Sequence, residues 1–261
     1  MTGDDFFVKV NPAGPDQAQV VSELRRLKIP FVVIGGVAMG AYARARYTDD
    51  VDVVVPVGQA SALADHLAAL FPGSRVQKHS LRTPSGVGIR GKNYYRIMVG
   101  HGKERKEIAD VSPADLYPQY GPAHAGARFQ SIQGYESFGQ VPVPGREEML
   151  ALKILASAAQ NRKFVAKLSD ETDIMNLIPG ANLVKVRGLI QGVHGGEEQL
   201  ARVLSIYRAR GEKKNPQADK LFGAPRAQCW ICGRSIPLVR GGRFKAHDSN
   251  YRRCAGSGVI A

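Results

Sequence analysis

The chain has 261 residues, of which 44% are hydrophobic and 7% aromatic, and it carries a net charge of +13. No apolar run approaches the ~18 residues of a membrane span, and the first residues lack the basic and apolar regions of a signal peptide. A membrane protein is therefore excluded, the odd number of cysteines excludes a disulfide framework, and we expect a globular protein of the cytoplasm.

Strand-like and helix-like segments alternate through residues 1–143. Phe31 to Ile34 has the composition of a short buried strand, which Gly35 and Gly36 end. Further strands are predicted over residues 50–55, 94–99, 107–111 and 129–132, and helices over residues 37–45 and 61–71. This mixture predicts an α+β fold with a mixed β-sheet for the domain.

Beyond residue 143 the pattern becomes helical. Helices are predicted over residues 146–160, 170–177, 182–191 and 197–210, which together indicate a helical domain over 144–210. Residues 211–226 are rich in Lys, Asn, Pro and Gly and predict a linker. Residues 227–261 contain every cysteine of the chain and form a predicted C-terminal module.

Two aspartates at the start of the second predicted strand carry most information about function. Asp50 and Asp52 share one face of a strand, about 6.6 Å apart along it. Two such charges repel unless a cation lies between them, and Mg²⁺ commonly bridges carboxylates to substrate phosphates. Gly35 and Gly36 at a strand end allow backbone N–H groups to approach a phosphate. The alternatives are a solvated strand edge and an ordinary turn.

A third carboxylate is expected for phosphoryl chemistry with two metal ions. Asp110 ends a predicted strand, and a neighbouring position in the sheet would bring it beside Asp50 and Asp52. The alternative is an aspartate that caps the turn before Ser112 and Pro113.

The order of an apolar strand, Gly-Gly, a short helix, Arg-x-Thr-x-Asp-x-Asp and an apolar strand resembles nucleotidyltransferases with the DNA polymerase β-like fold. With Arg46, Thr48, Asp50 and Asp52, the pattern is similar to that of the bacterial AbiEii-type nucleotidyltransferases. Many members of that family are toxins of toxin–antitoxin or abortive-infection systems. The resemblance covers about residues 30–178.

The resemblance extends into the helical domain. It assigns nucleotide binding to Lys153 and to Asp170, which is the first residue of an Asp-x-x-Asp motif. In the family a lysine often precedes this motif, whereas in this chain the preceding residue is Ser169. Lys153 shares a polar helical stripe with Ser157 and Gln160, where a lysine can neutralise a triphosphate. The alternatives are a solvent-facing lysine and an aspartate that caps its helix.

The resemblance implies transfer of a nucleoside monophosphate from an NTP to an acceptor, with release of pyrophosphate. RNA, in particular the tRNA 3′ end, is the implied acceptor, and an antitoxin protein is an implied partner. The implied site residues are Asp50, Asp52 and Asp110 as ligands of two Mg²⁺ ions, with Asp110 also as base, and, for the nucleotide, Gly35, Gly36, Arg46, Thr48, Lys153 and Asp170.

The C-terminal module contains four residues with the spacing of metal ligands. Cys229 and Cys232 form a C-x₂-C pair, His247 follows after fourteen residues, and Cys254 follows after six more. Three thiolates and an imidazole suit one structural Zn²⁺ ion, and so small a module needs such a staple to fold. The sequence predicts a zinc-ribbon-like module; the alternative is a reduced tail with coincidental spacing.

Positive charge is concentrated in the same part of the chain. Residues 201–261 contain thirteen basic and three acidic residues, and so carry ten of the thirteen net charges. Such a concentration indicates a polyanionic partner, most often nucleic acid, although a solubilising tail is the alternative. The residues predicted to bind nucleic acid are Arg234, Arg240, Arg243, Lys245, Arg252 and Arg253.

Three functions stay open from the sequence. The leading one is a nucleotidyltransferase that acts on nucleic acid. The second is a nucleotidyltransferase that modifies a small molecule, such as an aminoglycoside, or a protein side chain, and the basic tail disfavours the small molecule. The third is a non-catalytic nucleic-acid-binding protein, which the three aspartates disfavour.

Overall fold

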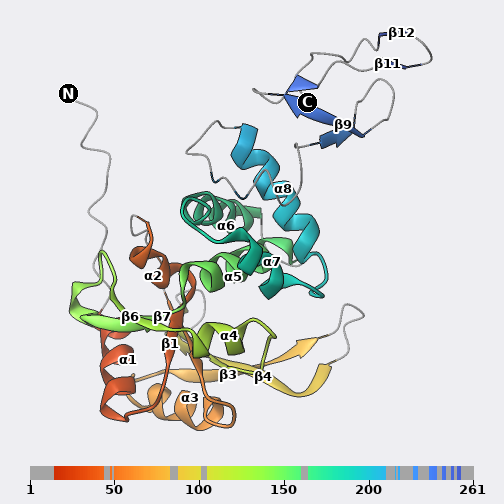
Figure 1. Ribbon diagram of the computed structural model, residues 1–261. Coiled ribbons are helices and arrows are strands. Elements are labelled where there is room, and N and C mark those ends of the chain that lie inside the picture. Colours follow the sequence, from red (N-terminus) through yellow and green to blue (C-terminus); the bar gives the residue numbers. More distant parts are fainter. Residues whose placement is uncertain are drawn as a thin grey trace, which may run out of the picture. The chain divides into compact units, whose positions relative to one another are not determined.

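The computed structural model describes residues 15–43, 48, 50–82, 88–100, 105–159, 164–209, 215 and 217, together with five short strands near the C-terminus (Figure 1). The chain divides into two compact units, Met1–Met149 and Leu150–Ala261. This division falls inside a helix, whereas the predicted boundaries at residues 143, 210 and 226 stay predictions.

A five-stranded mixed sheet forms the centre of the first unit. Its strand order is β1 (Val32–Ile34), β2 (Val51–Val55), β5 (Lys106–Pro113), β4 (Gly88–Val99) and β3 (Arg75–Arg82). Strands β2 and β5 are parallel, and the other neighbours are antiparallel. The predicted α+β fold with a mixed sheet is thereby confirmed.

Apolar strands and helices build the core around this sheet. The valines of β1 and β2 are almost fully buried, as expected for the short apolar runs that predicted these strands. Helix α1 (Pro15–Arg26) contacts β5, and α3 (Ala60–Ala69) contacts β3, β4 and β5. The remaining elements of the unit are α2 (Gly35–Ala38), η1 (Met39–Ala41), α4 (Tyr120–Ala125), β6 (Arg128–Ser131), η3 (Glu136–Phe138) and β7 (Gln140–Val143).

Helices make up the described part of the second unit up to residue 209. They are α5 (Arg146–Ala158), which begins at the end of the first unit, α6 (Phe164–Leu177), α7 (Leu183–Ile190) and α8 (Gly196–Ala209). Asn182 caps α7, because its side-chain oxygen accepts hydrogen bonds from Val184 N and Lys185 N. Helix α6 begins six residues before the predicted start at Asp170, so the alternative in which Asp170 caps this helix is wrong.

Five short strands are described near the C-terminus. Strands β8 (Arg226–Gln228), β9 (Ser235–Val239) and β10 (Arg243–Phe244) form one antiparallel sheet, and β11 (Asp248–Ser249) pairs with β12 (Arg252–Arg253). Predicted residues outside the described part are Arg46, the zinc ligands Cys229, Cys232, His247 and Cys254, and the basic residues Arg234, Arg240 and Lys245. None of the described helices has the length and apolar character needed to span a bilayer.

Candidate active site

The parallel pairing of β2 and β5 brings two of the predicted carboxylates together. Asp52 on β2 is the register partner of Asp110 on β5. Register partners on adjacent strands project from the same face of a sheet, about 5 Å apart. Asp110 and Asp52 are 58 positions apart in sequence, and the strand register makes them neighbours.

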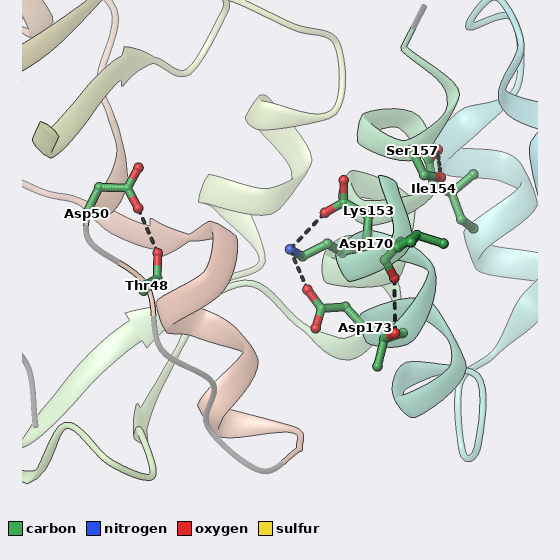
Figure 2. Close-up of polar contacts among 9 residues, drawn as sticks. Thr48, Asp50, Lys153, Ile154, Ser157, Asp170 and Asp173 are labelled. Atoms are coloured by element: carbon green, nitrogen blue, oxygen red, sulfur yellow. Dashed lines mark hydrogen bonds and ion pairs between the residues drawn. The ribbon is translucent and has the colours of Figure 1, made fainter. Parts of the chain in front are cut away.

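Asp50 lies two residues before Asp52, where the chain enters β2. The Thr48 hydroxyl donates a 2.7 Å hydrogen bond to Asp50 Oδ1 (Figure 2). Asp50 also lies close enough to Asp110 to raise the pKa of that carboxyl. The predicted nucleotide ligand Thr48 therefore has a role in this structure that the sequence did not indicate, which is to orient the Asp50 carboxylate.

Gly35 makes room for the Asp52 side chain. Its backbone is left-handed, with φ of +69°, and a Cβ atom at this position would lie only 1.8 Å from Asp52 Oδ2. Ile34, the preceding residue, is paired with Asp52 across β1 and β2. A glycine is therefore required here both by the backbone conformation and by the approach of the carboxylate. Its neighbour Gly36 is buried.

Two further charged residues belong to this site, and sequence reasoning missed both. Arg96 on β4 is the register partner of Asp110. Its Nε lies 3.4 Å from Asp110 Oδ2 and 3.3 Å from Glu107 Oε1. A signal existed for Arg96, since it shares one face of a predicted strand with Tyr94 and Met98, but nothing in the sequence identified the partner strand.

Burial dominates the electrostatics of the carboxylates on β5. It raises the pKa of Asp110 to about 6; Arg96 and the Ser112 hydroxyl oppose the rise, and the Asp50 carboxylate adds to it. Burial likewise raises the pKa of Glu107 to about 7, opposed by Arg96 and increased by Asp50 and Asp110. The site thus holds more negative charge than its own residues neutralise, which favours a bound cation.

The raised pKa of Glu107 predicts a loss of stability as the pH rises. Below pH 4.5 its carboxyl is protonated in folded and unfolded chains alike, whereas above pH 7 the folded chain holds a partly buried charge. Glu107→Gln is therefore expected to exceed the wild type in free energy of unfolding by about 1 kcal/mol at pH 8, after allowance for solvent screening, and to show no gain at pH 4. Urea unfolding at both pH values measures this; equal gains at both would exclude titration of Glu107 as the cause.

The carboxylates suit Mg²⁺ in donor type and strand register. Hard oxygen ligands from Asp50, Asp52 and Asp110 are those that Mg²⁺ prefers. Among the described residues, however, no three acidic, histidine or cysteine side chains are gathered closely enough to hold a metal ion as they stand. The carboxylates are directed to other partners, Asp50 to Thr48 and Asp110 to Arg96 and Ser112. Metal binding therefore requires them to turn toward one another.

In the second unit, Lys153 is buried against two aspartates. Its Nζ lies 3.2 Å from Asp170 Oδ1 and 2.7 Å from Asp173 Oδ2, and none of the three side chains is more than 5% exposed (Figure 2). The alternative of a solvent-facing lysine is therefore wrong. Ser157, on the same stripe, donates to Ile154 O and accepts from Gln199 Nε2. Nucleotide binding by Lys153 and Asp170 stays a prediction.

Comparison with known proteins gives structural neighbours but no family. No protein-family model matches the sequence, and no curated protein matches it significantly. The chain is similar in structure to an antigenic nucleotidyltransferase-like protein from Paracoccidioides brasiliensis, with 20% identity, a TM-score of 0.47, and coverage of 75% of this chain and 90% of that one.

Two other solved structures resemble the chain. The antibiotic-resistance factor ANT(2'')-Ia is 15% identical, with a TM-score of 0.45 and coverage of 70% of this chain and 92% of its own. A CCA-adding enzyme is 17% identical, with a TM-score of 0.34 and coverage of 78% and 48%. These neighbours are nucleotidyltransferase-like proteins, and at such low similarity the reaction and acceptor of the present chain have to be inferred from its own site.

Proposed function

We propose that the first unit is a metal-dependent nucleotidyltransferase, which transfers a nucleoside monophosphate from an NTP to a nucleic-acid acceptor and releases pyrophosphate. The observation that carries this proposal is the parallel register of Asp52 and Asp110 beside the left-handed turn at Gly35. An ordinary solvated strand edge needs neither a glycine fitted against the carboxylate nor a second aspartate opposite it.

The proposed roles follow from the chemistry of each group. Asp50, Asp52 and Asp110 would hold the divalent metal, which when bound supplies positive charge that stabilises the attacking and leaving oxygens of an in-line displacement. Asp110 would also accept the proton of the acceptor hydroxyl, and its pKa of about 6 suits a base that works near neutral pH. The turn at Gly35 would bring backbone N–H groups to the triphosphate.

A nucleic-acid acceptor is proposed because of the charge at the C-terminal end. Ten of the thirteen net positive charges lie in residues 201–261, and basic groups bind phosphates. We propose that Cys229, Cys232, His247 and Cys254 hold one structural Zn²⁺ ion in this segment. RNA and the tRNA 3′ end as acceptor, a role as a toxin, an antitoxin partner and a cytoplasmic location are proposed on the sequence resemblance and composition alone.

The proposal is tested by offering the full-length protein each of the four labelled NTPs, with total RNA and Mg²⁺. We expect label in RNA that disappears when EDTA removes the metal, because the metal stabilises charge in the transition state. Parallel reactions contain an aminoglycoside or total cellular protein in place of RNA. If label enters only the aminoglycoside or only the protein, and not the RNA, then that compound class is the acceptor in place of nucleic acid. Absence of label from all three, or label unaffected by EDTA, would contradict nucleotidyl transfer by this site.

A further inference from the structure

Arg96 lies between two carboxylates at almost equal distances. Its Nε is 3.3 Å from Glu107 Oε1 and 3.4 Å from Asp110 Oδ2. The same nitrogen is buried without an aligned hydrogen bond to either oxygen. The side chains of Asp110 and Glu107 are 14% and 23% exposed and that of Arg96 is 38% exposed, so water screens these charges only in part. One guanidinium is therefore shared by two acids and fully committed to neither.

An irregularity in the backbone creates this arrangement. Strand pairing runs from Ile97 with Ala109 to Met98 with Glu107, so that β5 has one extra residue, Ile108, opposite β4. In a regular strand, residues three apart point to opposite faces. A β-bulge places two residues against one and re-aims the side chains that follow it. The bulge at Ile108 thus brings Glu107 to the face that carries Asp110.

Charge explains what a second acid beside Arg96 can do. Asp110 lies opposite Asp52 and close to Asp50, so a divalent cation at these carboxylates would bind the same carboxylate that now faces Arg96. A guanidinium and a metal ion compete for one carboxylate, and they repel each other at short range. Glu107 offers the guanidinium another acceptor within the same reach.

We propose that Arg96 exchanges partners when the metal binds: it is shared by Asp110 and Glu107 in the metal-free protein, and it pairs with Glu107 alone once Asp110 ligates a divalent cation. This inference rests on the proposed function, since it takes Asp110 as a metal ligand. Arg96 and Glu107 are positioning residues, which act on metal affinity through Asp110.

The exchange predicts a specific non-additivity. In Glu107→Gln, Asp110 is the only one of the two acids that still carries a charge for Arg96 to pair with. Because the metal then has to displace Arg96 from Asp110, metal binding weakens by about fivefold, the size expected for one partly buried ion pair. Arg96→Gln removes the competitor and binds the metal at least as tightly as the wild type. In the double variant, adding Glu107→Gln to Arg96→Gln changes the metal affinity less than about twofold, because the guanidinium that would pair with Glu107 is absent.

The experiment measures Mn²⁺ binding to the full-length protein at pH 8 without nucleotide, from the electron paramagnetic resonance signal of free Mn²⁺. Asp110→Asn reports any Mn²⁺ that is bound elsewhere on the chain. Arg96→Lys keeps the positive charge. Adding Glu107→Gln to Arg96→Lys should therefore weaken metal binding as much as Glu107→Gln does in the wild type. Arg90→Gln is the matched control, because it removes the same charge from an exposed position on the same strand.

The outcomes separate this inference from the proposed function. A fivefold effect of Glu107→Gln that vanishes in the Arg96→Gln background supports the exchange of partners. Equal effects of Glu107→Gln in both backgrounds, or a markedly weaker affinity of Arg96→Gln, overturn the exchange while the metal site stands. Mn²⁺ binding that is absent from the wild type, or unchanged in Asp110→Asn, overturns the metal site and the exchange together.

Discussion

Gly35→Ala is expected to lower nucleotide incorporation by at least about 100-fold. A Cβ atom at this position would lie 1.8 Å from Asp52 Oδ2, so the carboxylate has to move away from where the fold now holds it. A displacement of about 1 Å in a catalytic group is enough for a loss of this size. The measurement is the rate of transfer from labelled NTP in the presence of Mg²⁺, with Asp52→Asn as the benchmark for complete loss of this ligand.

Gly58→Ala separates the two costs that the Gly35 substitution combines. Gly58 also has a left-handed backbone, with φ of +87°, but nothing lies within 4 Å of the Cβ that an alanine would add. Both variants carry the strain of an L-residue in this conformation, about 1–2 kcal/mol. Both should therefore unfold more easily in urea, while only Gly35→Ala should lose activity. Comparable losses of activity in the two variants would show that strain, and not the position of Asp52, limits the reaction.

The sequence predicted the strands whose composition is governed by burial. Residues 32–34 and, apart from Asp52, residues 51–55 are apolar because both faces of these strands are buried, and such runs can be recognised without a partner. Strand β3 was missed because its sequence, RVQKHSLR, is largely polar. It lies at an edge of the sheet, and none of its residues from Arg75 to Leu81 is buried, so the apolar signal disappears. Helix α1 was also missed, although Val20, Val21 and Leu24 give it a buried face.

The carboxylate pattern could be predicted only in part. Period-two alternation assigned Asp50 and Asp52 to one face, and the need for a third acid indicated Asp110. The contribution of Glu107 could not be predicted, because it depends on one extra residue in the pairing of β4 with β5. Spacing along a single chain segment contains no information about a bulge, which is defined by two strands together.

Helical periodicity had a similar limit at Lys153. The stripe that it forms with Ser157 was identified correctly, but periodicity says which residues share a face and not what covers that face. Here the cover includes Asp170 and Asp173 on α6, and Gln199 on α8. The stripe therefore contacts side chains of the same unit, while nucleotide binding by Lys153 stays a prediction.

Lys153→Met is expected to lower the free energy of unfolding by about 3–5 kcal/mol. The substitution leaves two carboxylates, each at most 5% exposed, without the ammonium that they share, and an uncompensated buried charge has a cost of this order. The contrast is Glu197→Gln, which breaks the exposed pair with Arg187 on the surface of the same unit and should cost about 0.5 kcal/mol or less. Urea unfolding followed by far-ultraviolet circular dichroism measures both.

A triple variant identifies charge as the cause of that loss. Adding Asp170→Asn and Asp173→Asn to Lys153→Met removes the two negative charges together with the positive one. Most of the lost stability should then return, because replacing a whole buried ion cluster by uncharged groups often changes the free energy of unfolding little. If the triple variant is instead as unstable as Lys153→Met, then packing around the lysine stem, and not its charge, stabilises this part of the helical unit. The triple variant also keeps the test informative should Lys153→Met fail to fold. If the triple variant then folds, the failure of Lys153→Met is caused by the two charged carboxylates that the triple variant lacks.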